Sequence, residues 1–133
     1  MGDDKNFSEL GKQLAELGIA FDDVKSRVKE MPEDKKRNIF IGFANQIINE
    51  KPEEAFLAAK EANDTVLVRS SARKLLEVNL RLASRVATAS EDEDLMELVI
   101  EEATKRNDAA MVEMMKRQLK EKRLKALSKQ FGI

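Results

Sequence analysis

The sequence predicts an all-α protein of about six helices, arranged as a stack of helical hairpins or as an irregular helical bundle. The first observation is composition: helix-forming residues dominate the 133 positions, with only two prolines and five glycines. The second is patterning, because no segment alternates polar and apolar residues for long enough to indicate a β-strand. The length suits one domain, and we therefore expect residues 1–133 to form a single helical domain.

The composition also limits the chemistry. The sequence has no Cys, His, Trp or Tyr, which excludes disulfides, thiolate or imidazole metal sites and every histidine-based triad. It contains no phosphate-binding, dinucleotide-binding or metalloprotease motif. We expect no cofactor, no metal site and no enzymatic activity. An enzyme that relies on carboxylates alone is the remaining catalytic alternative.

The N-terminal helices are predicted between residues 7 and 49. Apolar side chains there recur at alternating spacings of three and four residues, which forms a heptad seam. The seam consists of Phe7, Leu10, Leu14, Leu17, Phe21, Val24 and Val28, followed by Met31. It could pair with a second copy of the chain, giving a homo-oligomer, or it could pack on neighbouring helices of the same chain.

Three residues mark helix ends in this region. Asn6 is typical of a helix N-cap. Gly18 followed by Ile19 is typical of a helix stop, so we favour two short helices over one helix that continues across the glycine. Pro32 stops the helix that carries the end of the seam and can serve as the first residue of the next helix.

The rest of the chain is predicted as two helical hairpins, residues 51–89 and 95–131. A shift of 44 residues aligns ten identical residues without a gap. Among them the corner Asn63–Asp64 aligns with Asn107–Asp108; Asp64 is a candidate N-cap, and we expect the last helix to start after Asn107–Asp108. The period is similar to that of HEAT-type repeats, which implies a HEAT- or TPR-like solenoid. The residues that define those families are not recognisable, so the similarity concerns architecture and transfers no functional residue.

The helix predicted from Thr65 to Ala89 is the most apolar of the chain. Apolar residues cover more than half of its circumference, so we expect it to contact neighbours on several sides. Ser90 and Glu93 have the spacing of a capping box, which predicts that the following helix begins there.

Charge is distributed in blocks along this half of the chain. Residues 65–89 carry a net charge of +4, residues 90–104 carry −7 and residues 105–133 carry +6. Four arginines follow one polar face of the 65–89 helix: Arg69, Arg73, Arg81 and Arg85. This arginine ridge could pair with the acidic helix, bind an acidic protein partner or contact nucleic-acid phosphates.

The C-terminal helix is the second basic candidate. Its strongest candidates for a partner or a phosphate are Lys116, Arg117, Lys120 and Arg123. The bases surround the helix, so they could stay solvated or bind an acidic partner, nucleic acid or an anionic surface. An acidic surface is formed by Glu93, Glu97 and Glu101. A solvated helix face explains these carboxylates better than a metal site does.

These features together predict a non-enzymatic helical adaptor, assembly factor or regulator that acts through protein–protein contact. The alternative is a nucleic-acid-associated regulator that uses the arginine ridge and the basic C-terminal helix. The sequence has neither the pattern of a signal peptide nor a long apolar run, so we expect a cytoplasmic protein without membrane insertion.

Overall fold

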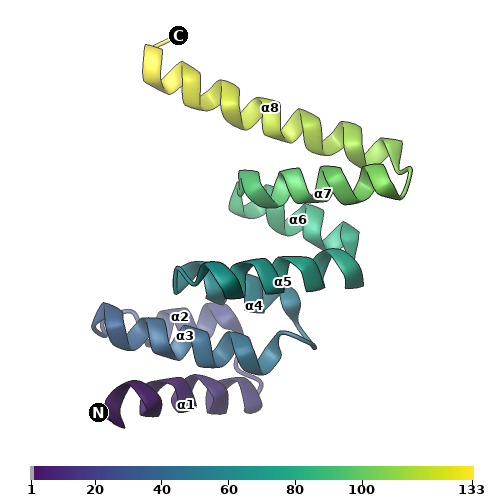
Figure 1. Ribbon diagram of the computed structural model, residues 1–133. Helices are drawn as coiled ribbons and strands as arrows, with labels where there is room; N and C mark the ends of the chain where they lie inside the picture. The colour runs from purple at the N-terminus through teal and green to yellow at the C-terminus, as the bar shows by residue number, and fades with distance from the viewer. Residues whose placement is uncertain (1) are drawn as a thin grey trace. The chain divides into compact units, whose positions relative to one another are not determined.

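The computed structural model describes the backbone of residues 2–133 and the side chains from Asn6 onward. This part of the chain forms eight α-helices and no strand (Figure 1). Their bounds are α1 Gly2–Glu16, α2 Phe21–Arg27, α3 Glu33–Ile47, α4 Pro52–Glu61, α5 Thr65–Val78, α6 Leu80–Ser90, α7 Glu93–Lys105 and α8 Ala109–Phe131. The predicted all-α class is confirmed, whereas the predicted count of about six helices is too low.

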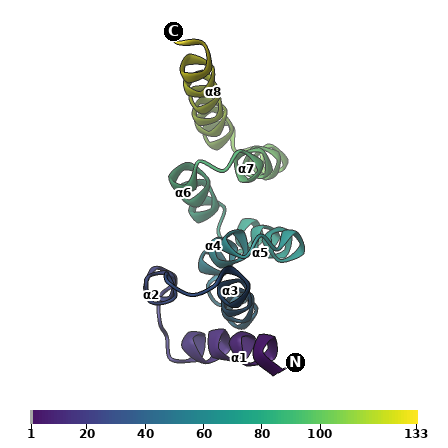
Figure 2. The same cartoon turned by 90° about the vertical axis from the view of Figure 1, so that its left-hand side faces the viewer.

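The helices divide into two compact units, Met1–Lys74 and Leu75–Ile133, and α5 contributes to both. In the first unit α3 packs between α1 and α4, and α2 contacts α4 (Figures 1 and 2). In the second unit α7 packs between α6 and α8. The boundary falls inside the predicted 51–89 hairpin, and the solenoid arrangement stays a prediction.

The core of the first unit joins bulky side chains of α2 and α3 to small side chains of α4. Phe40 and Phe43 of α3 are buried, and the ring of Phe40 lies 5.9 Å from that of Phe21 of α2. The buried alanines of α4 are Ala55, Ala58 and Ala59. Their small size lets α4 approach the aromatic layer closely.

The helices α1 and α3 meet backbone to backbone at two glycines. Gly11 of α1 lies against the carbonyl group of Ile39, and Gly42 of α3 lies against the carbonyl group of Ser8. A Cβ atom at either glycine would overlap the facing backbone. Only glycine therefore permits this separation of the two helices.

The predicted break near Gly18 is confirmed. Gly18 has a φ of +77°, and the amide of Ile19 donates to the carbonyl oxygen of Leu14 at 3.1 Å, which closes the end of α1. The predicted N-cap at Asn6 is wrong, because α1 begins at Gly2 and includes Asn6.

Residues 65–89 form two helices rather than the single helix predicted. Asn79 has an extended backbone with φ −157°, and its side-chain oxygen accepts a hydrogen bond from the amide of Leu82 at 3.0 Å. Asparagine is favoured at an N-cap, and it is unfavourable inside a helix because its side chain competes for backbone groups. Asn79 therefore ends α5 and caps α6.

Three corners share one local geometry: Asn63–Asp64, Glu91–Asp92 and Asn107–Asp108. The first residue of each has a positive φ, of 54°, 51° and 58° respectively. Each Asp then accepts a hydrogen bond from the amide three residues later, at 3.0, 3.0 and 3.1 Å. The predicted cap at Asp64 and the predicted helix start after Asn107–Asp108 are confirmed. The cap predicted at Ser90 is wrong, because Ser90 is the last residue of α6 and its hydroxyl donates to the carbonyl of Val86.

Candidate functional site

Helix α8 is the element whose surface is least covered within the second unit. It has 23 residues, whereas α7, on which it packs, has 13. Asp108 caps its first turn, and Gly132 ends it with a φ of +68°. Met115 and Leu119 are its buried residues, and they lie in its N-terminal half.

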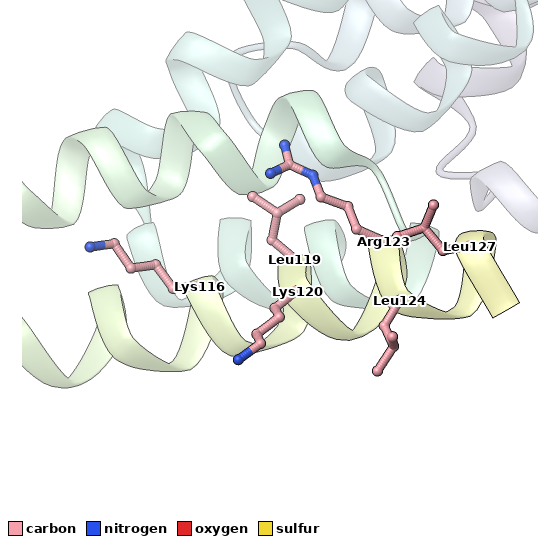
Figure 3. Close-up of a pocket in the computed structure, with 6 residues that line it drawn as sticks. All are labelled: Lys116, Leu119, Lys120, Arg123, Leu124 and Leu127. Atoms are coloured by element: carbon pink, nitrogen blue, oxygen red, sulfur yellow. The ribbon is translucent and has the colours of Figure 1, made fainter. Parts of the chain in front are cut away.

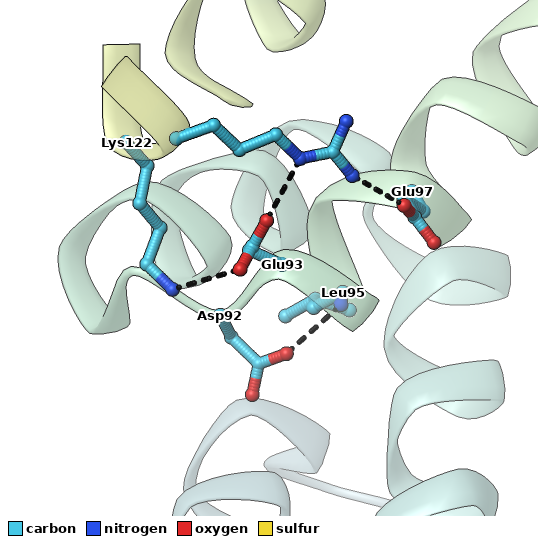
Figure 4. Close-up of polar contacts among 6 residues, drawn as sticks. Asp92, Glu93, Leu95, Glu97 and Lys122 are labelled. Carbon is cyan, nitrogen blue, oxygen red and sulfur yellow. Dashed lines mark hydrogen bonds and ion pairs between the residues drawn. The ribbon is translucent and has the colours of Figure 1, made fainter. Parts of the chain in front are cut away.

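Ion pairs join the middle of α8 to the first turns of α7 (Figure 4). Arg123 donates from Nε to Glu93 and from Nη2 to Glu97, both at 3.0 Å, while Lys122 Nζ lies 3.5 Å from Glu93. The hydrogen bond from Arg123, followed by the charge of Lys122, holds the pKa of Glu93 below its usual value. Because all these side chains are well exposed to solvent, the pairs orient α8 more than they stabilise it.

The C-terminal third of α8 extends beyond α7. Glu93 is the first residue of α7 and already pairs with Arg123, so α8 runs past the end of α7 from residue 124 onward (Figure 1). Three large apolar side chains of this extension are solvent-exposed: Leu124 at 56%, Leu127 at 48% and Phe131 at 66%. An apolar stripe of this kind on a helix is typical of a contact surface.

These side chains belong to a heptad seam on the outer face of α8, which we call the outer seam. It consists of Arg117, Lys120, Leu124, Leu127 and Phe131, at alternating spacings of three and four. At 3.6 residues per turn the five positions fall within an arc of about 80°. The buried Met115 lies on the opposite side of the helix, and the buried Leu119 lies on the flank, about 80° around the helix from Leu127.

The side chains of α8 also border an open depression of about 390 Å³. Its lining residues are Lys116, Leu119, Lys120, Arg123, Leu124 and Leu127 (Figure 3). Figure 3 shows Leu119 and Arg123 on the side of the helix opposite to Lys120 and Leu124. Three leucines supply the apolar surface of the depression, and two lysines and Arg123 add cationic groups to its lining.

The predicted basic residues of α8 divide into two groups. Arg123 is engaged with α7, as described above. Lys116, Arg117 and Lys120 are exposed, and within residues 6–133 they take part in no ion pair shorter than 4.0 Å. The positive charge of these three is therefore free to meet a partner.

The predicted arginine ridge is divided by the helix break at Asn79. Arg69 and Arg73 lie on α5 in the first unit, whereas Arg81 and Arg85 lie on α6 in the second. All four are exposed, and the described residues contain no acidic partner within 4.0 Å of any of them. A single ridge along one helix is thus wrong, although each pair of arginines remains accessible.

The predicted acidic face is largely neutralised. Glu93 and Glu97 pair with α8, and Glu101 pairs with Lys105 of the same helix at 3.7 Å. The residues that the structure describes contain no group of three or more carboxylates placed to hold a metal ion.

The predicted oligomerisation seam is not one continuous surface. Phe21, Val24 and Val28 are buried in the core of the first unit, and Leu17, at the end of α1, is exposed. The break at Gly18 changes the direction of the chain between the two halves of the seam. The half of the seam from Phe21 to Val28 therefore packs within the chain, which is the second of the two predicted alternatives, and pairing of the whole seam with a second copy is not supported.

A second depression, of about 190 Å³, lies in the first unit beside Gly18 and includes Glu16, Glu50 and Glu54. One oxygen of Glu54 accepts a hydrogen bond from the amide of Phe21 at 2.6 Å, and the other lies 3.7 Å from Lys51. This carboxylate is therefore already used to hold the start of α2 against α4.

The apolar residues of the outer seam are the functional candidates that sequence reasoning missed. The sequence does contain a signal for these residues, because the spacing from Arg117 to Phe131 follows a heptad pattern. It was hidden because the first two positions of the seam are basic, and the surrounding bases suggested a helix solvated on every side.

Comparison with known proteins identifies no matching family model, no matching curated protein and no matching solved structure. Within the described residues, no helix has the length and apolar character required to cross a membrane.

Proposed function

We propose that this protein is a non-enzymatic helical adaptor, or an assembly or regulatory factor, that acts by binding another protein through the outer seam of α8. The observation that carries the proposal is the exposure of Leu124, Leu127 and Phe131 along one narrow line of a helix whose other side is packed.

Exposure of this kind is costly for a chain that works alone. Each large apolar side chain left in water forgoes roughly 1.5–3 kcal/mol of burial free energy, and three in one row form a contiguous patch. A facing helix would cover the row by knobs-into-holes packing, which is what heptad spacing permits. The N-terminal half of α8 is anchored by the buried Met115 and Leu119, and the exposed row follows on the C-terminal part of the same helix.

The test places a photo-crosslinking amino acid at position 127 in living cells. We expect a protein partner to be captured from position 127 and not from position 129, because Lys129 is about 160° away around the helix. The captured protein is identified by mass spectrometry, purified and mixed with the purified chain. Binding of the pure components should be lost with the double variant Leu124→Asp, Leu127→Asp. Equal capture from both positions, or capture from neither, contradicts the proposal.

A second candidate function is binding to nucleic acid, favoured by the four exposed arginines without ion-pair partners. Phosphate contacts of this kind weaken steeply with salt. The candidate predicts that Arg73→Glu and Arg81→Glu each reduce retention of a labelled RNA or DNA in a gel-shift measurement at low salt. No shift of either nucleic acid at low salt removes this candidate.

We also propose that the protein acts in the cytoplasm. A fluorescent fusion of the chain should therefore distribute through the cytoplasm, and accumulation at a membrane contradicts this part.

A further inference from the structure

We propose that the partner of the outer seam is an acidic amphipathic helix that pairs with α8 over about two heptads, its carboxylates opposite Arg117 and Lys120 and its apolar residues opposite Leu124, Leu127 and Phe131. The inference rests on the proposed function and specifies the chemistry of the partner.

The width of the seam indicates a single helix as the occupant. The three apolar positions lie within an arc of about 60°, which is narrower than the stripe of 100° or more that faces a broad core. A helix lying in a membrane surface needs a wide apolar face, and here Lys125 and Lys129 occupy the far side of the extension. A narrow line at alternating spacings of three and four is the surface that another helix covers.

The seam changes polarity along its length, which sets the chemistry of the occupant. Its first two positions are the cations Arg117 and Lys120, both exposed and without an ion pair among residues 6–133, and the exposed Glu113, four residues before Arg117, continues the spacing with one negative charge. Its last three positions are apolar and exposed. A complementary helix therefore carries carboxylates in one half of its seam and leucine-like residues in the other half.

A second copy of the chain fits poorly. Residues 105–133 carry a net charge of +6, so two copies of α8 repel each other. Parallel pairing would set Arg117 and Lys120 against their own copies. Antiparallel pairing centred on Leu124 would set Lys120 against the second copy's Leu127, so each cation would face an apolar residue.

Nucleic acid is also a poorer occupant of this seam. Phosphates would engage Arg117 and Lys120 but would leave Leu124 and Leu127 against a polar backbone. The only aromatic side chain of α8 that could stack on a base is Phe131, at the last position.

The experiment uses the full chain and designed peptides of 18 residues, acetylated, amidated and labelled with a fluorophore. Peptide A carries Glu at the seam positions of one half and Leu at those of the other, and it is made in both chain directions. Peptide B replaces each Glu of peptide A by Lys. Fluorescence anisotropy should show that peptide A binds in one direction at micromolar concentrations, that peptide B does not bind, and that salt weakens the binding of peptide A.

Matched variants on the same helix locate the contact. Lys120→Glu should weaken binding of peptide A by about tenfold and should allow peptide B to bind. Lys125→Glu makes the same charge change off the seam and should leave the affinity within about twofold, since it faces away. Leu127→Ala should weaken binding by about tenfold, because the lost apolar burial is worth about 1.4 kcal/mol. Circular dichroism confirms that the variants keep their helix content.

Four results would overturn the inference: no binding of peptide A in either direction, equal binding of peptides A and B, equal effects of Lys120→Glu and Lys125→Glu, or tighter binding of the chain to single-stranded RNA or to anionic vesicles through Leu127. If a partner is nevertheless captured at position 127 in cells, the proposed function holds and only the proposed chemistry of the partner is wrong. Absence of capture at position 127 together with absence of peptide binding would remove both proposals.

Discussion

The contact between α1 and α3 and the contact between α7 and α8 each hold two neighbouring helices together, but by different interactions. The first joins two helices of 15 residues each, and glycines bring their backbones into direct contact. The second joins helices of 13 and 23 residues through Met115, Leu119 and ion pairs to Glu93. The helices of the first pair match in length, whereas in the second pair α8 extends well beyond α7.

The two contacts differ in how much movement they allow and in how much helix surface they leave exposed. A glycine contact fixes the separation of two helices, because neither backbone can move closer to the other, so its role is structural. A contact made by a flexible methionine and exposed ion pairs tolerates adjustment, and the extension of α8 remains available for a partner.

The largest effect is expected for Met115→Ala, because the side chain of Met115 in α8 is fully buried. Truncation of a buried methionine leaves a cavity and should lower the free energy of unfolding by about 2–5 kcal/mol. The neighbouring Met114 is 41% exposed, so Met114→Ala serves as the matched control and should cost under about 1 kcal/mol. Urea unfolding followed by circular dichroism measures both, and equal costs would show that Met115 does not anchor α8.

The next effect is expected for Gly42→Ala, whose new Cβ would overlap the carbonyl group of Ser8. Helix propensity alone would make this variant more stable by about 1 kcal/mol. Overpacking of the contact should reverse the sign and lower the free energy of unfolding by about 1–3 kcal/mol. Gln46→Ala, at an exposed position one turn after Gly42, is the control and should be nearly neutral. A stabilised Gly42→Ala variant would mean that α1 and α3 are not in close contact.

A smaller effect is expected where the two units are alike. Asp64 and Asp108 cap α5 and α8 with hydrogen bonds of 3.0 and 3.1 Å. Substitution of either by Ala should cost about 1 kcal/mol, because one amide loses its acceptor. Asp→Asn at the same positions keeps an acceptor oxygen and should cost less. Thermal unfolding compares the four variants, and strongly different costs for the two Ala variants would show that the matching corners are not energetically equivalent.

The smallest effect is expected for the ion pairs of Glu93. The pKa of Glu93 in the folded protein lies below the ordinary value of 4.5, since Arg123 donates to its carboxylate. A lowered pKa means that the stabilisation is complete above pH 4.5 and is lost as the pH falls through the folded value. The stability difference between the wild type and Glu93→Gln should therefore be constant from pH 6 to 8 and should disappear in acid. A difference that persists unchanged at pH 3 would contradict the pairing.

The elements that could be predicted from the sequence depend on neighbouring residues only. The break at Gly18 and the caps at Asp64 and Asp108 are set by backbone conformation and by hydrogen bonds that reach three residues along the chain. Asn79 carried a similar local signal, yet the apolar pattern of residues 65–89 stays in phase across it and favoured one helix. Local capping outweighed a periodicity that was compatible with either structure.

In the candidate site, too, some properties could be predicted from the sequence and others depend on tertiary contacts. Lys116, Arg117 and Lys120 could be identified as exposed cations from composition, whereas Arg123 could not be separated from them, because its pairing with Glu93 depends on how α7 meets α8. The apolar residues of the outer seam could not be recognised, since a leucine in a helix is more often buried than exposed.

Helical secondary structure, several helix ends and the lack of cysteine and histidine chemistry could be predicted from the sequence alone, because helix propensity, capping and residue identity are properties of short segments. The tertiary structure decided which glycines are contacts, which bases are neutralised and which face of α8 stays open. These properties depend on the separation and relative length of helices that are distant in sequence, and a periodic pattern in one helix carries no record of what covers it.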